Sequence, residues 1–224
     1  MNLGLFRTQL ESVEGLLKVL GLYYAREWHP NYAAVRARDF RGVSYRDAWF
    51  KCYTSRYYDF ILTDFSILQF RLSGQNPLAV SYSYLECPNR ITPYTDFLRS
   101  LDFDPETVGD ALLPDYELEV PSFPIKAGVT PIRYDYDQER YQTGLHPVSH
   151  MHFGYESSIR VGTKRILKPL SFFLFILRQQ YRHNWSNLWG LDNTEHLYRN
   201  VRESLDMIDQ CYLKDQDYWE MMLD

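Results

Sequence analysis

The sequence predicts an α+β fold, in which an antiparallel sheet of five or six strands packs against a buried central helix. Alternating polar and apolar residues over 65–72 and 78–86 flank a Ser-Gly-Gln-Asn-Pro turn, as in a β-hairpin. Residues 170–183 are apolar on nearly every side, which is typical of a helix buried against a sheet. Helical patterns at both ends of the chain indicate extensions around this core.

The first 57 residues are expected to form a mainly helical N-terminal part. Apolar residues recur at steps of three and four between Leu5 and Arg26, which predicts one amphipathic helix. An arginine-rich loop follows over 28–42. Ser44, with Asp47 three residues later, is a favourable start for a second helix.

Residues 58–185 are expected to hold the sheet core and the histidines discussed below. The strands predicted after the hairpin are 116–120 (an edge strand), 132–137, 148–153 and 159–167. Short helices are predicted at 93–101 and 105–113. The sheet therefore accounts for most of the middle of the chain.

The C-terminal part, 192–224, is expected to be one long acidic helix. Asp192 and Glu195 have the spacing of a capping box, and an apolar stripe continues to Tyr212. A Trp-rich loop over 184–191 would precede it. Because no linker or internal repeat is found, residues 1–224 are predicted to form a single domain.

Composition narrows the class of protein. The chain starts without the basic and apolar regions of a signal peptide, and its longest apolar block, 172–177, is too short to span a bilayer. The dispersed Cys52, Cys87 and Cys211 form neither a disulfide framework nor a paired metal motif. Gly-rich phosphate loops and nucleophile elbows are missing from the sequence. We expect a cytoplasmic, bacterial protein without a membrane partner.

The net charge of −5 is unevenly distributed. Residues 192–224 carry nine acids against three bases, whereas residues 157–191 contain no acid. The bases of that second segment are Arg160, Lys164, Arg165, Lys168, Arg178 and Arg182. A basic segment of this kind suits a polyanionic ligand, although pairing with the acidic residues elsewhere in the chain would explain it equally well.

Residues 131–154 contain three of the six histidines and concentrate the candidate chemistry. Alternation places His150 and His152 on one face of one predicted strand. It also places Arg133 and Asp135 on one face of another. If the two strands pair, a carboxylate, a guanidinium and two imidazoles share one surface.

The first interpretation of this surface is acid–base cleavage of a phosphodiester without a cofactor. His150 and His152 would act as general base and general acid, because imidazoles exchange protons near neutral pH. His146 is a further catalytic candidate, and Asp135 would orient one ring. Since this route needs a ribose 2′-hydroxyl as nucleophile, it implies RNA.

Nucleic-acid contacts are expected from cations and tyrosines near the histidines. Arginine stabilises charge on phosphate oxygens, and aromatic rings stack on unpaired bases. The predicted binding residues are Arg133, Tyr134, Tyr136, Arg160, Lys164 and Arg165.

Two alternatives remain open for the histidines. A His-x-His strand with a third imidazole can bind a divalent metal, here through His146, His150 and His152, with Asp135 as an oxygen ligand. On the second alternative the histidines are structural and hydrogen-bonded within a polar sheet face.

Short motifs in this region resemble those of a bacterial family catalogued only as a domain of unknown function. They are Arg133-Tyr134-Asp135, His146-Pro147, Ser149-His150-x-His152 and Pro169-x-x-Phe172, within residues 60–185. The Arg-Tyr-Asp segment followed by histidines is also distantly similar to TumE-type toxins of toxin–antitoxin pairs, with longer spacing here. The resemblance implies a toxin-like or phage-defence role, acting on nucleic acid.

The leading hypothesis is therefore a toxin-like or defence-associated effector that cleaves RNA. The alternative is a non-catalytic subunit of a multi-protein defence complex, which binds nucleic acid through the basic segment. A protein partner, an antitoxin or a complex subunit, is expected at the acidic and aromatic tail, which includes Trp219.

Overall fold

The computed structural model describes residues 2–28, 42–74, 78–156, 159–191 and 194–214. Seven strands form one antiparallel sheet whose spatial order equals the order along the chain. They are β1 (Tyr23–Arg26), β2 (Phe60–Leu62), β3 (Ile67–Ser73), β4 (Ala79–Leu85), β5 (Ile132–Asp137), β6 (Ser149–Phe153) and β7 (Arg160–Gly162). The α+β class is confirmed, and the sheet is larger than the five or six strands predicted.

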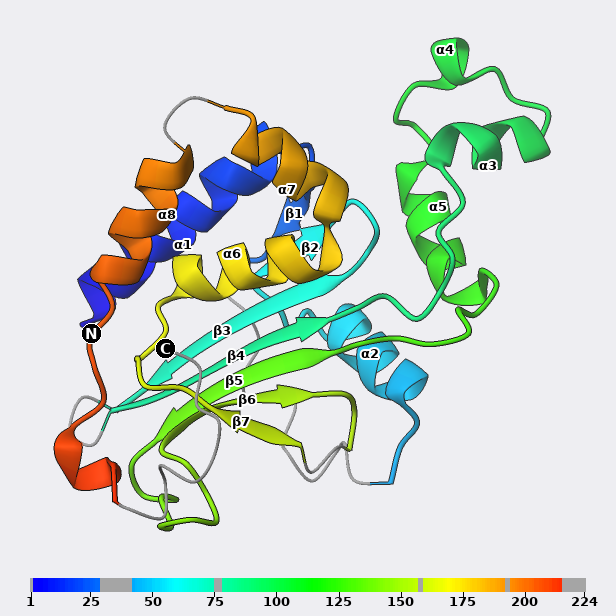
Figure 1. Ribbon diagram of the computed structural model, residues 1–224. Coiled ribbons are helices and arrows are strands. Elements are labelled where there is room, and N and C mark those ends of the chain that lie inside the picture. The colour runs from blue at the N-terminus through cyan, green and yellow to red at the C-terminus, as the bar shows by residue number, and fades with distance from the viewer. Residues whose placement is uncertain (1, 29–41, 75–77, 157–158, 192–193, 215–224) are drawn as a thin grey trace.

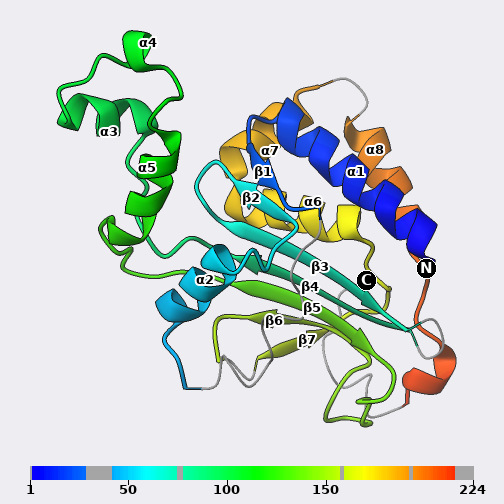
Figure 2. The same ribbon diagram turned by 180° about the vertical axis from the view of Figure 1, so that it is seen from behind.

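Helices cover the two faces of the sheet unequally. They are α1 (Leu3–Val19), α2 (Tyr45–Thr54), α3 (Tyr94–Ser100), α4 (Pro105–Val108), α5 (Leu113–Glu119), α6 (Pro169–Gln180), α7 (Arg182–Trp189) and α8 (Thr194–Glu203), with short 3-10 turns η2 (Val120–Ser122) and η3 (Gln210–Tyr212). Figure 1 shows α1, α6, α7 and α8 on one face, while α3 to α5 project from one end. From behind, α2 lies on the opposite face, toward the end from which α3 to α5 project (Figure 2). None of the helices in the described ranges is both long and apolar enough to cross a membrane.

The main core lies between α6 and the sheet. Pro169 begins α6, at a position where the N–H that proline lacks would have no partner within the helix. The Phe172 ring is fully buried and packs edge-on against Phe70 and at a tilt against Tyr82. Because side chains alternate along a strand, these contacts use only one face of β3 and β4. The neighbouring residues of the same strands therefore point to the other face.

A second, smaller core lies under α2. Ser44 caps this helix by accepting a hydrogen bond from the Asp47 N–H, in agreement with the sequence-based prediction. Trp49 is buried, stacks on Tyr53 and donates from its indole nitrogen to the Phe65 carbonyl. These contacts use the beginning of β3 and the chain before it. The rest of that sheet face carries polar side chains.

The predicted N-terminal helix over 5–26 is divided in the structure. The helix ends at Val19, and Gly21 adopts a positive φ of 65°, which favours glycine. Leu22 N–H donates to the Leu17 carbonyl across this turn, so the chain leaves the helix and continues as β1. The apolar pattern in the sequence extends beyond the end of the helix because the residues of β1 are also half-buried.

Two further assignments were wrong. Residues 116–120, predicted as an edge strand, belong mainly to α5, where the buried Tyr116 hydroxyl donates to the Thr92 carbonyl. The predicted Trp-rich loop contains α7, in which the ring centroid of Trp185 lies 5.5 Å from that of Trp189, one turn later. Tyr116 also packs against Phe65, and Trp185 against Tyr198, and local residue preferences do not encode such contacts between segments.

The chain after α8 departs from the predicted long helix. Instead of continuing past Glu203, it pairs with the segment that follows β7, where Ile166 N–H donates to the Asp206 carbonyl and Ile208 N–H to the Lys164 carbonyl. The strand predicted over 159–167 is correspondingly reduced to β7. Asp192, most of the loop 28–42 and the tail 215–224 with Trp219 lie outside the described residues.

Candidate active site

Two rows of residues cross the open face of the sheet, on the side away from α6. Cross-strand pairing places Ser81, Asp135, His150 and Gly162 in the first row, from β4 to β7. The second row consists of Ser83, Arg133, His152 and Arg160. The strand that carries Asp135 and the strand that carries the two histidines do pair, which is the condition that the sequence left open. His152 lies between two arginines, with Cβ atoms of directly paired residues about 5 Å apart.

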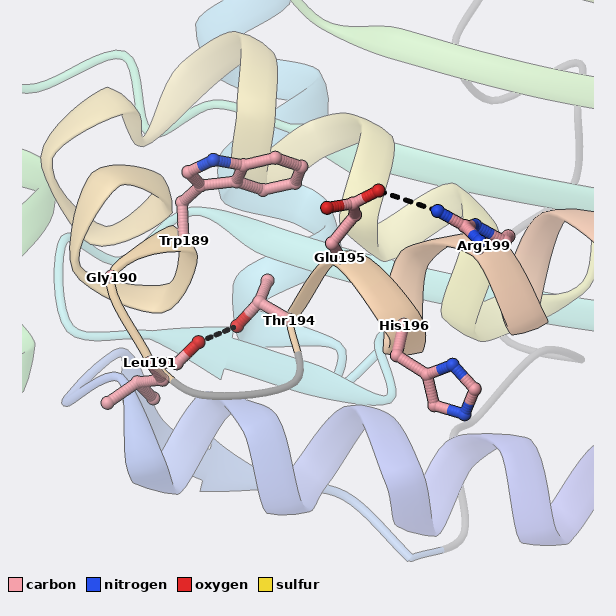
Figure 3. Close-up of a pocket in the computed structure, with 7 residues that line it drawn as sticks. All are labelled: Trp189, Gly190, Leu191, Thr194, Glu195, His196 and Arg199. Carbon is pink, nitrogen blue, oxygen red and sulfur yellow. Dashed lines mark hydrogen bonds and ion pairs between the residues drawn. The ribbon is translucent and has the colours of Figure 1, made fainter.

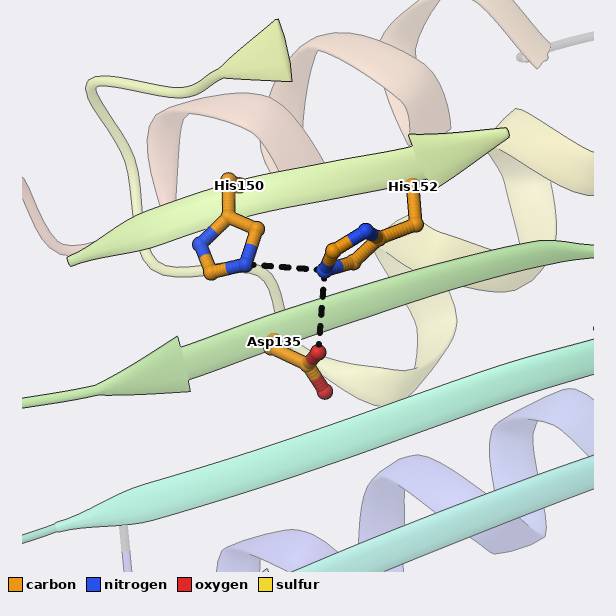
Figure 4. Close-up of side chains that lie close together, drawn as sticks. All are labelled: Asp135, His150 and His152. Atoms are coloured by element: carbon orange, nitrogen blue, oxygen red, sulfur yellow. Dashed lines mark hydrogen bonds and ion pairs between the residues drawn. The ribbon is translucent and has the colours of Figure 1, made fainter. Parts of the chain in front are cut away.

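The two imidazoles and the Asp135 carboxylate converge on one point (Figure 4). His150 Nε2 lies 3.0 Å from His152 Nε2, and His152 Nε2 lies 3.4 Å from Asp135 Oδ2. Both rings are buried, with exposed fractions of 1% and 6%. Within the part of the chain that the structure describes, this is the one group of three such side chains close enough to hold a metal ion.

Hydrogen bonding defines which ring nitrogens carry protons. His150 Nδ1 lies 2.8 Å from the Pro147 carbonyl, which can only accept, so Nδ1 carries the hydrogen. Burial, followed by the charge of His152, lowers the pKa of His150 to about 4 and keeps the ring neutral at pH 7. His150 Nε2 is therefore a lone-pair acceptor, and His152 Nε2–H donates to it.

Asp135 is held as a carboxylate by three partners. Ser81 Oγ donates to Oδ1 at 2.7 Å, and Arg133 Nε donates to Oδ2 at 2.7 Å. Burial alone would raise the pKa of Asp135, but the His152 hydrogen bond and the Arg133 charge outweigh it and hold the pKa well below its usual range. The site therefore combines a fixed negative charge on Asp135 with two imidazoles, of which that of His150 is neutral at pH 7.

His146 lies beside this group without joining it. Its ring packs edge-on against His150, with centroids 4.7 Å apart. Burial and the nearby Arg160 charge lower the pKa of His146. Its Nδ1 is buried and has no hydrogen-bond partner among the described residues. The predicted set of three histidines is thus replaced by two histidines and Asp135.

The convergent group lines a groove of about 1320 Å³, whose lining extends from the open face of the sheet to Leu3 and Phe6 of α1. Arginine and carboxylate side chains both line it, and Arg140 is 3.4 Å from Asp137. Arg160 is exposed and makes no ion pair with any described residue. This cation therefore stands next to His152, where an anionic ligand could reach both.

Several predicted nucleic-acid contacts are excluded by burial. Tyr134 and Tyr136, with exposed fractions of 0% and 3%, pack into the core on the α6 side. The prediction that their rings stack on bases is therefore wrong. Arg165 points its Nη1 toward carbonyls near the end of α8. Neither Arg165 nor Lys164 lines the groove, which leaves Arg133 and Arg160 as the predicted cations beside the histidines.

Ser81 is the site residue that sequence reasoning left without a role. The alternation predicted over 78–86 implies that Ser81 and Ser83 share one face, as they do in β4. Only the pairing of β4 with β5 shows that Ser81, and not Ser83, stands opposite Asp135. The Pro147 carbonyl was missed as well, because backbone acceptors leave no mark in the sequence.

A smaller hollow of about 530 Å³ lies where α7 ends and α8 begins (Figure 3). Its Glu195 and Arg199 side chains pair with each other at 2.6 Å, and Thr194 Oγ1 donates to the Leu191 carbonyl. His196 points away from that ion pair (Figure 3). Since its two charged side chains pair with each other and the Asp–His–His group lies elsewhere, the groove on the sheet is the candidate active site.

Fold and site together define an α+β protein with an open, antiparallel sheet that carries an Asp–His–His group. The chain belongs to a family of uncharacterized conserved proteins, DUF2290, whose model matches residues 22–218. No curated protein and no solved structure matches the chain. The expected membership of a domain family of unknown function is confirmed, whereas these matches do not show the likeness to TumE-type toxins.

Proposed function

We propose that this protein cleaves phosphodiester bonds in nucleic acid, with RNA as the favoured substrate. The supporting observation is the convergence of Asp135, His150 and His152 beside the exposed Arg160 in one large groove. Convergent titratable groups in a groove are typical of an active site. The sequence contains no Gly-rich phosphate loop that would indicate a different phosphate-binding site.

The two arginines next to His152 are the phosphate contacts in this proposal. Arg133 and Arg160 are paired across the strands with His152, one on each side. Arg133 is half-exposed even though it binds Asp135, so part of its guanidinium can reach a ligand. Guanidinium groups at this distance would stabilise negative charge that develops on the phosphoryl oxygens.

The geometry favours an arrangement in which both imidazoles act on the same side of the phosphate. It does not favour a general base on one side and a general acid on the other. An in-line displacement separates the attacking and leaving oxygens by the phosphoryl group. His150 Nε2 and His152 Nε2 are only 3.0 Å apart, which leaves no room for atoms between them. In our proposal both rings therefore act on the nucleophile side of the reaction.

The biological setting that we propose is a cytoplasmic, toxin-like or phage-defence-associated effector. Its support is the resemblance carried by Arg133-Tyr134-Asp135 and His146-Pro147 together with the following histidines. An antitoxin or a complex subunit would be the protein partner. Neutralisation of toxicity by a neighbouring gene product would test this setting separately from the chemistry.

The direct test uses the purified full chain and an end-labelled RNA oligonucleotide. We expect cleavage, and we expect Arg160→Ala to reduce it on the order of 100-fold, because one charge-stabilising donor is lost. His183→Gln is the matched control, since His183 is an exposed histidine on α7 outside the groove. Intact RNA under all conditions, or full activity of His150→Gln, would refute the proposal. RNA binding without cleavage would favour the alternative of a non-catalytic, nucleic-acid-binding subunit.

A further inference from the structure

We infer that Asp135, His150 and His152 form a binding site for one divalent first-row transition metal ion, with zinc as the expected occupant. The ligands are two imidazole Nε2 atoms and one carboxylate oxygen. This inference deepens the proposed function, because it assigns the reaction chemistry, but metal binding can be measured without any nucleic acid. His146, which the sequence grouped with the other histidines, is not a ligand.

Two of the three spacings between the ligand atoms fit a metal of this size. Two ligands about 2.05 Å from a tetrahedral zinc ion are about 3.3 Å from each other. The distance from His150 Nε2 to His152 Nε2 is 3.0 Å, and that from His152 Nε2 to Asp135 Oδ2 is 3.4 Å. All three ligand atoms lie within 4.8 Å of one another. In the tautomer of His152 that carries its proton on Nδ1, both Nε2 atoms present lone pairs to the same point, as a shared metal ion requires.

Neighbouring groups orient each ligand, as they do in metal centres. The Pro147 carbonyl accepts from His150 Nδ1 and so directs the Nε2 lone pair toward the site. Ser81 and Arg133 hold the two oxygens of Asp135. Ligands on adjacent strands of a sheet are also held more precisely than ligands on loops.

The site has an open side. The position opposite His150 on β7 is Gly162, which has no side chain to fill the space. The three ligand residues line the groove of about 1320 Å³, so a fourth coordination position can face it. Three protein ligands with a fourth position for water are the pattern of catalytic zinc, whereas structural zinc is usually closed by four protein ligands.

A metal at this point changes the expected substrate range. With both Nε2 lone pairs bound to the ion, water becomes the nucleophile, because the ion lowers its pKa. The water oxygen bonds to phosphorus, the bond from phosphorus to the leaving nucleoside oxygen breaks, and one water proton passes to that oxygen. No ribose 2′-hydroxyl is needed, so DNA of the same sequence would be cut as well as RNA, without cyclic phosphate products.

The test is a titration of Zn²⁺ into the full chain after removal of metal with EDTA. We expect one equivalent to bind, with affinity reduced at least 100-fold in Asp135→Asn and in His152→Gln. His183→Gln should bind like the unaltered protein. Co²⁺ should give the visible absorption of a four- or five-coordinate site. Circular dichroism of each variant checks the fold, and a zinc-dependent rise in the melting temperature of the unaltered protein provides a second measurement that needs no variant.

The outcomes separate this inference from the proposed function. Absence of stoichiometric Zn²⁺ and Co²⁺ binding in the unaltered protein, or binding unchanged in both ligand variants, overturns the metal site. RNA cleavage that persists in EDTA and yields 2′,3′-cyclic phosphate would overturn the metal chemistry while the proposed function stands. Stoichiometric metal binding without cleavage of RNA or DNA would support the site and refute the function.

Discussion

Replacing Ser81 with alanine tests whether Asp135 is fixed by the contacts described above. Ser81 Oγ donates a 2.7 Å hydrogen bond to the Asp135 carboxylate, whose side chain is 20% exposed. Hydrogen bonds to charged groups contribute about 1.5–3 kcal/mol. Arg133 remains bound to the other oxygen in the variant, so the carboxylate keeps a partner. We therefore expect a loss at the lower end, about 1.5–2 kcal/mol of unfolding free energy.

Urea denaturation measures this loss, and the chain offers a matched control. For a slope of about 3 kcal/mol per molar urea, the midpoint should fall by roughly 0.5–0.7 M. Ser83→Ala removes the same hydroxyl from the same strand face, but Ser83 stands opposite Arg133 and its hydroxyl makes no hydrogen bond to a described residue. The control should stay within about 0.5 kcal/mol of the unaltered protein.

The pH dependence gives a second check of the same reasoning. The folded-state pKa of Asp135 lies below the unfolded value of about 3.9. Its contribution to stability is therefore fully present above the unfolded pKa and is lost as the pH falls through the folded pKa. The difference between the two serine variants should be equal at pH 6 and pH 8. Equal stability of the two variants, or a difference that changes between these pH values, would refute this account of Asp135.

Two further predictions concern the cores. Phe172→Ala should lower the unfolding free energy by about 3–5 kcal/mol, because the ring is fully buried between α6 and the sheet. Urea denaturation measures this loss. A loss below about 1.5 kcal/mol would contradict the assignment of α6 as the main cover of the sheet. Iodoacetamide at pH 8 should label only Cys211 in the folded protein and all three cysteines in urea, because burial raises the pKa of Cys52 and Cys87 to about 12. Mass spectrometry would count the labels, and modification of either buried thiol in the folded state would be the contrary result.

Predictions from the sequence were most successful where the signal is local. Alternation placed Arg133 and Asp135 on one face of β5 and His150 and His152 on one face of β6, as the structure shows. The N-cap at Ser44 was also correct. Each of these features depends on residues within a few positions of one another, where spacing and side-chain chemistry are sufficient.

Predictions failed where distant contacts outweigh local preference. The pattern after Val19 was interpreted as continuing helix, although residues 23–26 pair with β2 as an edge strand. Tyr134 and Tyr136 were expected to face a ligand because aromatic rings stack on unpaired bases. Both rings instead fill the core beneath α6, since alternation does not say which face of a strand a helix will cover.

The sequence by itself determined which residues share a strand face and that residues 131–154 hold the candidate chemistry. Tertiary structure alone decided that Asp135 lies opposite His150, that Ser81 holds its carboxylate, and that His146 stands beside the group rather than in it. Alternation repeats every second residue and fixes faces within a strand, whereas register is set by backbone pairing between segments far apart in the chain. A shift of that register would separate the carboxylate from both imidazoles.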